Sequence, residues 1–468
     1  MHVTWIRLWT IVLPATCVLA FAACSSTSPH PAAKLAFLVQ PSDALPGEVI
    51  TPVIEVAIQD AAGNTVTTAE DRVTVALGAN PAGASLSGSA STYPSSGVAR
   101  FRLSVNKAGS GYTLTASAPG LAGDTSASFR IVTIDLESVS AGENFTCGVA
   151  AGGSAYCWGL IGGDSGSLNH PVPALVTGGL TFAAVSAGHI YACGLTSGGA
   201  AYCWSFYTRG IPEAVAGGLA FSSVSVGDPG ACGLAAGGVA YCWNGPFGTA
   251  PVALPGGLTF AALSNGGASC GVTVSGAAYC WGSNYRGRLG NGDTLSHASP
   301  VAVVGGLTFA TVSVGAIHAC GVTTSGAAYC WGDNHFGQLG NGASDQLPHT
   351  APVEVAGGLA FLTVSVGSSH SCGVTMSGAA YCWGWNDLGQ LGIGTPLGIG
   401  DHDELPHPTP VSVAGGLTFA TVSAGASHTC GLNTGGIAYC WGFNGNGQVG
   451  IRTTGNLVST PARVAGQP

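Results

Sequence analysis

The stretch HSCGVTMSGAAYCWG, residues 370–384, decides the fold of this 468-residue chain. Two cysteines stand ten positions apart, with a turn of small residues between them and Trp-Gly directly after the second. Much the same phrase occurs seven times, at spacings of 38 to 58 residues. A period of about 40 to 50 residues with strand composition is typical of a β-propeller. The aligned tryptophans are Trp158, Trp204, Trp243, Trp281, Trp331, Trp383 and Trp441.

A glycine at a constant place indicates the register of each repeated hairpin. If the midpoint of the cysteine pair is the hairpin centre, a three-residue loop needs a left-handed third residue, where glycine fits best. All seven repeats have it, at Gly153, Gly199, Gly238, Gly276, Gly326, Gly378 and Gly436. The two cysteines then face each other across antiparallel strands, near the spacing that a disulfide needs.

We therefore expect one disulfide in each repeat. The alternative is zinc, but zinc sites prefer cysteines two to four positions apart, and here nine residues intervene. The tryptophan after each pair is expected to pack between neighbouring blades. The predicted pairs are Cys147–Cys157, Cys193–Cys203, Cys232–Cys242, Cys270–Cys280, Cys320–Cys330, Cys372–Cys382 and Cys430–Cys440.

The fuller repeats share a longer phrase, HACGVTTSGAAYCWGDNHFGQLGNG at residues 318–342. Its Trp331-Gly332, Asn334 and Gly337–Gly340 resemble the regulator of chromosome condensation repeat family. The resemblance implies a seven-bladed β-propeller over residues 134–468, which binds other proteins through its loops. It also implies an alternative, nucleotide exchange on a small GTPase, which export of the chain would contradict.

The ends of the repeat region suggest how the ring closes. The first unit starts at Leu136 and lacks the "PV" segment that precedes every other unit. The chain ends with TPARVAG, which contains such a segment. We predict that Pro461–Ala465 completes the blade that begins at Leu136.

The first 23 residues read as a bacterial signal peptide. Arg7 precedes an apolar run, Leu8 to Ala23, that is short for a membrane span. Of fifteen cysteines left after removal of the signal, fourteen fall in the seven pairs, and Cys24 remains. Cys24 is therefore expected to carry a lipid, with residues 24–33 as a tether. The alternative is ordinary cleavage after Ala20-Phe21-Ala22. Either way the protein is expected in the cell envelope or secreted, touching the membrane only through the lipid.

Residues 34–133 predict an N-terminal β-sandwich. Short alternating runs, separated by Gly, Pro, Asn and Asp, resemble bacterial immunoglobulin-like domains and suggest a spacer or adhesion module. The fold class is thus all-β, a propeller preceded by an immunoglobulin-like domain. The runs are KLAFLVQP, VIEVAIQD, RVTVALG, ARFRLSV, YTLTASA and SASFRIV.

The charge of the chain and its lack of known motifs argue against several classes of function. Charged residues make up 7% of the chain, the formal net charge is −9, and only five basic residues follow residue 133, which argues against nucleic acid. We find no catalytic or phosphate-binding motif and expect no enzyme activity, cofactor or metal. The sequence favours a monomeric scaffold for an extracellular protein partner, with a carbohydrate-binding or adhesion module as an alternative.

Two groups of polar residues are candidates for a site. His318, His370 and His428 each precede a cysteine by two positions, and we expect a structural role rather than a metal site. A polar cluster, GIGDHDELPHPTP, is a candidate partner-binding loop, with calcium or zinc binding and a merely solvated loop as alternatives. We hypothesise that the partner docks on the loops of blades five and six, Ala343–Thr350 and Gly394–Pro408. The cluster contains Asp401, His402, Asp403, Glu404 and His407.

Overall fold

The computed structural model describes residues 31–161, 169–228, 230–245, 249–394, 403, 405–455 and 457–468. The predicted signal peptide and Cys24 lie outside these ranges. In the part of the chain that they cover, no helix has both the length and the apolarity to cross a membrane.

The chain forms two compact units. One holds the residues up to Asp43 together with Val49–Arg130, and the other holds Ala44–Glu48 with Ile131–Pro468. Both are built from strands, and the described helices are three single 3-10 turns. These turns are η1 (Phe206–Thr208), η2 (Ala236–Gly238) and η3 (Tyr285–Gly287).

The first unit consists of small antiparallel sheets, and each of the six predicted runs contains a strand. Alternate residues are buried, as in Leu35 and Phe37 or Val73 and Val75, because one face of each sheet packs on the core. Its likeness to an immunoglobulin domain stays a prediction. The sheets are β1 (Lys34–Val39), β2 (Ile54–Gln59) and β6 (Val98–Phe101); β10 (Asp124–Thr125), β9 (Leu114–Ser117), β3 (Val73–Leu77) and β5 (Ser91–Thr92); β11 (Phe129–Ile131) and β8 (Gly109–Tyr112); and β4 (Leu86–Gly88) and β7 (Leu103–Val105).

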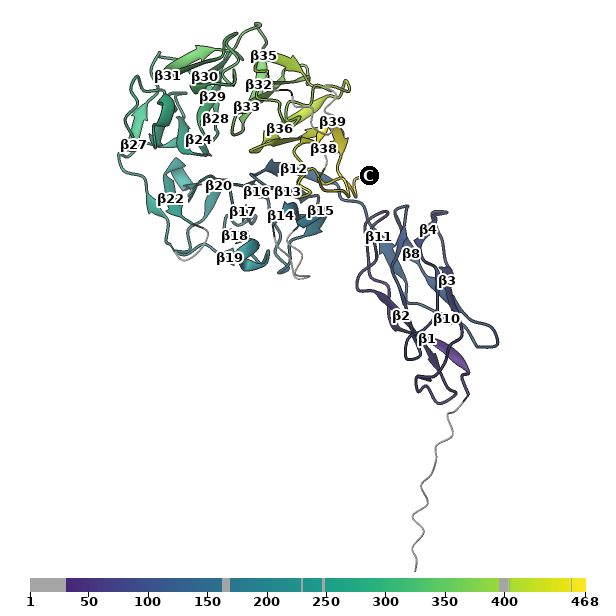
Figure 1. Ribbon diagram of the computed structural model, residues 1–468. Helices are drawn as coiled ribbons and strands as arrows, with labels where there is room; N and C mark the ends of the chain where they lie inside the picture. Colours follow the sequence, from purple (N-terminus) through teal and green to yellow (C-terminus); the bar gives the residue numbers. More distant parts are fainter. Residues whose placement is uncertain are drawn as a thin grey trace, which may run out of the picture. The chain divides into compact units, whose positions relative to one another are not determined.

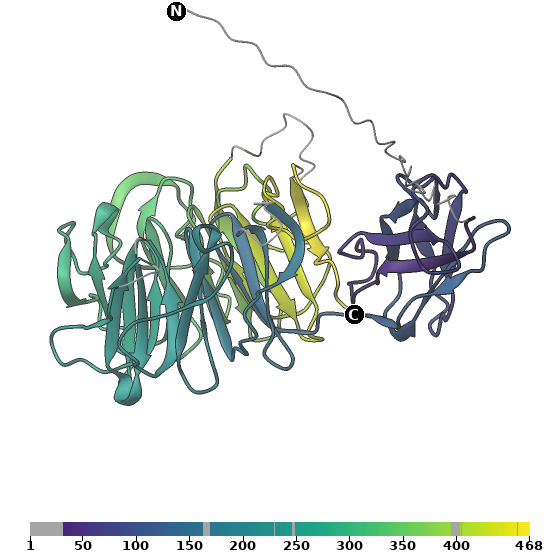
Figure 2. The same ribbon diagram turned by 90° about the horizontal axis from the view of Figure 1, so that it is seen from below.

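The second unit is a ring of four-stranded sheets around a central axis, which Figure 1 shows face on and Figure 2 from the side. Its described residues form seven such sheets, here called blades 1 to 7, each an antiparallel meander in chain order. Blade 1 is β12 (Leu136–Ala141), β13 (Phe145–Ala150), β14 (Ala155–Leu160) and β15 (Asn169–Leu175); blade 2 is β16 (Ala184–Ala187), β17 (Tyr191–Leu195), β18 (Ala201–Ser205) and β19 (Glu213–Ala214); blade 3 is β20 (Phe221–Val226), β21 (Gly230–Ala235), β22 (Ala240–Asn244) and β23 (Val252–Ala253); blade 4 is β24 (Phe260–Asn265), β25 (Ala268–Thr273), β26 (Ala278–Gly282) and β27 (His297–Ala302). Blade 5 is β28 (Phe309–Val314), β29 (His318–Thr323), β30 (Ala328–Asn334) and β31 (Asp345–Glu354); blade 6 is β32 (Phe361–Val366), β33 (His370–Thr375), β34 (Ala380–Gly384) and β35 (His407–Ser412); blade 7 is β36 (Phe419–Ala424), β37 (His428–Asn433), β38 (Ala438–Gly442) and β39 (Val458–Arg463).

The cysteine hairpins have the predicted register. In blade 6, Cys372 on β33 lies opposite Cys382 on β34, and Thr375 and Ala379 close a three-residue loop. Gly378, third in that loop, has φ +84°, and the equivalent glycine of every blade is also left-handed. All seven predicted cysteine pairs are disulfide-bonded in the structure.

The prediction for the end of the chain was wrong. Pro461 and its neighbours lie in β39, which pairs with β38 of the same blade, with Tyr439 opposite Arg463. Blade 1 already has its own fourth strand, β15, paired with β14. The "PV" segment is therefore the outer strand of the blade before it, because it follows the cysteine hairpin directly and pairs with the strand nearest in the chain.

The two ends of the ring are joined without a shared strand. The amide of Ile134 donates to the carbonyl of Gly466 at 2.7 Å. The side chain of Gln467 donates to the carbonyl of Ile134 and accepts from the amide of Ala438, at 2.9 and 3.1 Å. Leu136 of β12 packs in one apolar cluster with the disulfide of blade 7. Packing and a few hydrogen bonds thus replace strand exchange at the seam.

A belt of serines joins the innermost strands around the whole ring. In each blade the hydroxyl of one inner-strand serine accepts a hydrogen bond from a backbone amide of the next blade, at 2.8 to 3.0 Å. The belt closes where Ser423 of blade 7 accepts from Ala141 of blade 1. Its members are Ser140, Ser186, Ser225, Ser264, Ser313, Ser365 and Ser423.

The tryptophans lie between blades, as predicted. Trp383 of blade 6 packs in one cluster with the disulfide of blade 5 and with Leu339. Leu339 belongs to the Gly-Gln-Leu-Gly segment, and both side chains are fully buried. A Cβ atom on Gly340 would lie 2.7 Å from the Trp383 ring, so glycine is required there. The repeated Gly-Gln-Leu-Gly segment, which we call the wedge, therefore packs against the tryptophan of the following blade and fixes its position.

Candidate functional site

The meander of each blade sorts its connections onto two faces of the ring. Connections after the first and third strands leave at one edge of the sheet, which we call the loop face. The cysteine hairpins and the Gly-Gly-Leu segments leave at the other, the hairpin face. Residues 134–468 hold fourteen acidic and five basic residues, a formal charge of 5 − 14 = −9. Eight of the acids lie in described loop-face connections or at the strand ends beside them, namely Glu143, Glu213, Asp228, Asp293, Asp333, Asp345, Asp387 and Asp403.

Blade 5 shows how its loop-face connection is held. The side-chain oxygen of Asn334 accepts from the amide of Leu339 at 3.2 Å, and its amide nitrogen donates to Asp345 Oδ2 at 3.2 Å. Nε2 of His349 donates to the same carboxylate at 3.2 Å. Asn334 is fully buried, so this one side chain connects the wedge to the start of the outer strand. We call this arrangement the Asn–Asp–His staple.

The staple recurs in blades 4 and 6. In blade 6, Asn386 accepts from Leu391 N and donates to Asp403 Oδ2 at 2.8 Å, while His407 contacts Asp403 at 2.9 Å. In blade 4 the same bonds join equivalent residues at 2.9 to 3.2 Å. The three staples are Asn284/Asp293/His297, Asn334/Asp345/His349 and Asn386/Asp403/His407.

Hydrogen bonding keeps the staple carboxylates ionised. Burial raises the pKa of Asp403, but hydrogen bonds from Asn386 and His407 outweigh it and hold that pKa below its ordinary value. The pKa of Asp345 is lowered in the same way. In Asp293 the hydrogen bond from the amide of Leu295 is the main cause of the lowered pKa. Each staple carboxylate is therefore ionised at neutral pH.

Each staple presents an exposed leucine. The spacing Asp-x-Leu-x-His places the leucine between the two ionisable residues, at Leu295, Leu347 and Leu405. Their exposed fractions are 67%, 71% and 73%. The amides of Leu295 and Leu347 donate to their aspartates at 2.8 and 2.9 Å, which holds the backbone that carries each side chain. His297 and His407 begin the outer strands β27 and β35, and Asp345 begins the outer strand β31. The three leucines therefore stand along the outer rim of the loop face.

The predicted partner-binding residues are only partly within the described chain. Asp403 and His407 form the blade 6 staple, whereas Asp401, His402 and Glu404 lie outside the described residues. The segment Ala343–Thr350, expected to be a loop, is largely strand, because Asp345–Glu354 pairs with β30. Sequence reasoning missed the repeated Asp-x-Leu-x-His spacing, although it is visible at residues 293–297, 345–349 and 403–407.

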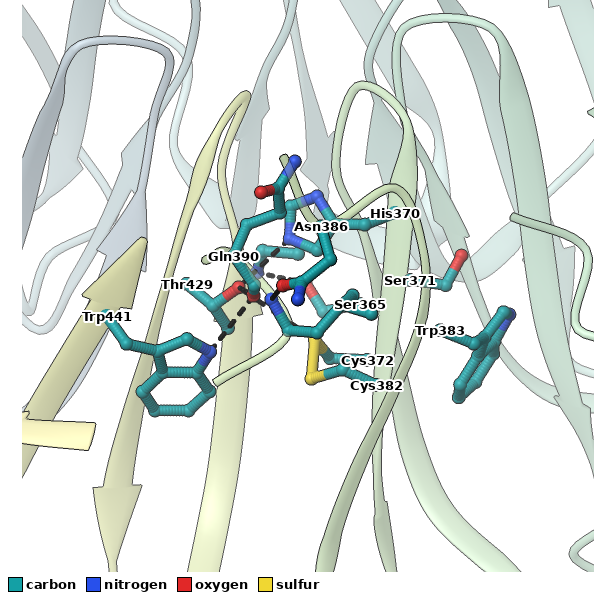
Figure 3. Close-up of a disulfide and its surroundings, with 12 residues drawn as sticks. Ser365, His370, Ser371, Cys372, Cys382, Trp383, Asn386, Gln390, Thr429 and Trp441 are labelled. Carbon is teal, nitrogen blue, oxygen red and sulfur yellow. Dashed lines mark hydrogen bonds between the residues drawn. A yellow bond between two sulfur atoms is a disulfide. The ribbon is translucent and has the colours of Figure 1, made fainter. Parts of the chain in front are cut away.

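The three predicted histidines belong to hydrogen-bonded junctions between blades. Figure 3 shows one: His370 Nε2 of blade 6 lies 2.9 Å from the hydroxyl of Thr429 in blade 7. That hydroxyl donates to the carbonyl of Gln390 at 2.8 Å, and the indole of Trp441 donates to the same carbonyl at 3.0 Å. Because the hydroxyl hydrogen goes to the carbonyl, the histidine must donate from Nε2. We call this set the histidine relay.

Relays also join blades 5 and 6 and blades 7 and 1. Nε2 of His318 lies 2.7 Å from Oγ of Ser371, and Nε2 of His428 lies 2.8 Å from Oγ1 of Thr146. Burial lowers the pKa of each of the three histidines to about 3, so all are neutral. No group of three or more His, Cys, Asp or Glu side chains in the described residues is arranged to hold a metal ion.

In comparisons with known proteins, part of the second unit matches the repeats of one family. Residues 275–322, 325–374 and 377–432 each match the regulator of chromosome condensation (RCC1) repeat, and a second model of that repeat matches 309–338, 361–390 and 419–448. The chain therefore contains RCC1 repeats, in the part that forms blades 4 to 7.

Curated relatives share short regions with the chain. The ultraviolet-B receptor UVR8 of Arabidopsis thaliana is 32% identical over 100 residues, which are 21% of each chain. A protein RCC2 homolog of Xenopus laevis is 33% identical over 115 residues, 24% of this chain and 21% of that protein. The chain thus spans about a fifth of the length of these relatives. The structure of human WBSCR16 has a TM-score of 0.56 at 17% identity and covers 66% of this chain and 89% of its own, which shows the fold alone.

Proposed function

We propose that this protein is a non-enzymatic interaction scaffold that binds a protein partner on the loop face of blades 4 to 6. The observation that carries the proposal is the row of three exposed leucines, Leu295, Leu347 and Leu405, each on its own Asn–Asp–His staple. Exposed apolar side chains held on a rigid backbone cost little conformational entropy when a partner buries them. Loops on a rigid scaffold are also where repeat proteins present binding residues.

The staples indicate the chemistry of the partner. Each leucine stands beside an ionised aspartate, and the ring as a whole is acidic. A partner surface with apolar side chains and nearby Lys or Arg would complement both features, and the charge would accelerate its encounter with the ring. Asp403 and His407 of the predicted cluster form the staple of blade 6, so the proposal retains these two residues and extends the site to blade 4.

The test begins with identification of the partner by cross-linking in intact cells of the source organism and mass spectrometry. Affinity is then measured for purified chains. The triple variant Leu295→Ser, Leu347→Ser and Leu405→Ser should bind at least about a hundredfold more weakly, because three central apolar contacts are lost.

A matched control lies on the hairpin face. Val274, Leu362 and Met376 are 83%, 53% and 70% exposed, and their replacement by serine removes a similar apolar area. The control variant should keep full affinity. If both triple variants bind the partner as tightly as the unmodified chain, the partner does not use the leucine row.

We further propose that the ring is a complete seven-bladed propeller of the RCC1 type, held at the cell envelope by a lipid on Cys24, with the immunoglobulin-like unit as a spacer. Seven disulfides support an oxidising compartment. Palmitate labelling should be lost in Cys24→Ala, with the protein released to the soluble fraction. An unmodified N-terminus at Ala23 would instead establish ordinary signal cleavage.

A further inference from the structure

A cavity of about 530 Å³ lies on the axis of the ring, and all seven blades line it. Most of its lining is Gly, Ala and Val from the connections between first and second strands. Four lining residues carry or can carry charge: Glu143, His189, Asp228 and Arg288. The volume falls within the range of small-molecule sites, and a few polar groups in an otherwise apolar wall are typical of such sites.

Arg288 is a buried cation that has no counter-ion among the described residues. It is 8% exposed, and it stands where blades 5, 6 and 7 have Gln338, Gln390 and Gln448. Its Nε donates to the carbonyl of Ser283 at 2.7 Å, and its Nη1 donates to the carbonyl of Ala316. No carboxylate of the described chain pairs with it.

A buried charge that is not neutralised is unfavourable. Burial lowers the pKa of Arg288 for the same reason. Because two neutral carbonyls hold the guanidinium at the cavity wall, an entering anion would be stabilised there by a charge-assisted hydrogen bond. Glutamine at the equivalent positions of three blades shows that the fold itself does not require the charge.

The acidic side chains form an arc over blades 1 to 3. Glu143, His189 and Asp228 each follow the axial glycine of their blade, and His189 contacts Glu143 through Nε2. Its Nδ1 lies 3.9 Å from Asp228 Oδ1. The side chains of Glu143 and Asp228 are 33% and 65% exposed, so they remain open to a ligand.

Other blades have no acidic residue at this position. Blades 4 to 7 carry Gly267, Ala316, Ser368 and Ala426 there. The guanidinium of Arg288 reaches from blade 4 to a carbonyl of blade 5, and in a ring of seven that boundary is opposite blade 1. The positive wall of the cavity therefore lies opposite Glu143 of blade 1, and the acidic arc continues from there through blade 2 to Asp228 of blade 3.

We propose that the axial cavity binds a small zwitterion with separated charges, its carboxylate on Arg288 and its ammonium group on the exposed carboxylates of the acidic arc, Glu143 or Asp228. An anion alone would be repelled by the acidic arc, and a cation alone would leave Arg288 uncompensated. A ligand with both groups joined by a short chain satisfies both walls, as an ω-amino acid or a short peptide does.

The experiment uses three probes of equal chain length on the full mature chain near pH 7.5. Isothermal titration calorimetry compares 6-aminohexanoate with hexanoate and with hexylamine. The zwitterion should bind, and each single-charge analogue should bind at least about tenfold more weakly. No detectable binding of 6-aminohexanoate at about 10 mM, or equal binding of all three probes, overturns the proposal.

Two arginine variants locate the site. Arg288→Gln, which copies the residue of blades 5 to 7, should weaken 6-aminohexanoate binding about tenfold without changing the circular dichroism spectrum. Arg286→Gln removes the same charge from the surface two residues away and should leave binding unchanged. Equal effects of the two variants, or none from Arg288→Gln, would show that Arg288 does not hold the carboxylate.

Discussion

The junction between blades 6 and 7 and the junction between blades 2 and 3 share a backbone plan but differ in what joins them. At the first, His370, Thr429, the carbonyl of Gln390 and the indole of Trp441 form one buried hydrogen-bonded set. Every blade has its own disulfide and its own belt serine, so neither feature distinguishes the two junctions. The difference therefore lies in the side chains between the sheets.

At the second junction the relay is absent. Tyr191 occupies the histidine position, and Ala231 replaces the hydroxyl residue. The Tyr191 hydroxyl and the indole nitrogen of Trp243 have no hydrogen-bond partner in the described residues. An apolar cluster that includes Phe221 and Leu195 holds these blades together instead. Blade 2 lacks the Gly-Gln-Leu-Gly wedge, so no glutamine carbonyl is brought to the tryptophan.

The comparison teaches that one ring can be assembled by two kinds of junction. The hydrogen bonds of a buried polar network form only in one arrangement, so the network specifies how two blades meet. An apolar junction depends on area and shape and tolerates more substitution. The wedge decides between them, because it supplies both the leucine that covers the tryptophan and the carbonyl that accepts from it.

Acid should weaken the polar junctions most. The pKa of His318, His370 and His428 is about 3 in the folded chain, below the ordinary 6.5 of the unfolded chain. The unfolded chain therefore binds more protons between these values. Above about pH 6.5 the histidines do not reduce the free energy of unfolding, and this free energy falls as the pH drops from 6.5 toward 3. At pH 5 the loss should be about 2 kcal/mol for each histidine, about 6 kcal/mol in all.

Denaturant unfolding at pH 7.5 and pH 5 measures this effect. His370→Gln removes one titrating group, so its loss between the two pH values should be smaller than that of the unmodified chain by about 2 kcal/mol. His335→Gln, at an exposed position, serves as the control. An equal pH dependence in all three chains would contradict the assignment of the acid sensitivity to the relays.

Removal of one relay hydroxyl should have the next largest effect. Ser371→Ala leaves His318 Nε2 buried without an acceptor and removes one of two donors to the Gln338 carbonyl. The free energy of unfolding should fall by about 2 kcal/mol. Ser269→Ala changes the same position of blade 4, which faces no histidine, and should cost less than about 1 kcal/mol. Equal losses from the two substitutions would show that the relay adds nothing.

Grafting a relay should give the smallest change. Between blades 4 and 5 the carbonyl of Arg288 already accepts from Trp331 at 2.9 Å, but Ala268 and Ala319 replace the histidine and the hydroxyl residue. The variant Ala268→His, Ala319→Ser and Arg288→Gln copies the next junction. Relative to Arg288→Gln alone, it should gain about 1 kcal/mol near pH 7.5 and lose the gain at pH 5. Thermal unfolding that shows no gain at either pH would mean that the backbone at this junction does not position the relay.

The sequence by itself determined the local structure. Each cysteine pair, its three-residue loop and its left-handed glycine lie within eleven consecutive residues, so hairpin geometry alone specified the seven disulfides. The alternating runs of the first unit likewise predicted strands, and the histidines of the relays were correctly expected to be structural. These features depend on neighbours a few positions away, which is why they could be predicted from the order of residues alone.

Only the tertiary structure decided which segment belongs to which blade. A repeated sequence has a period but no starting point, and the RCC1 repeat at residues 275–322 itself runs from one blade into the next. Strand pairing places Pro461 in blade 7 rather than blade 1. The serine belt and the charges around the axial cavity were also beyond the sequence. Each brings together residues from separate blades, and their contacts exist only once the ring has closed.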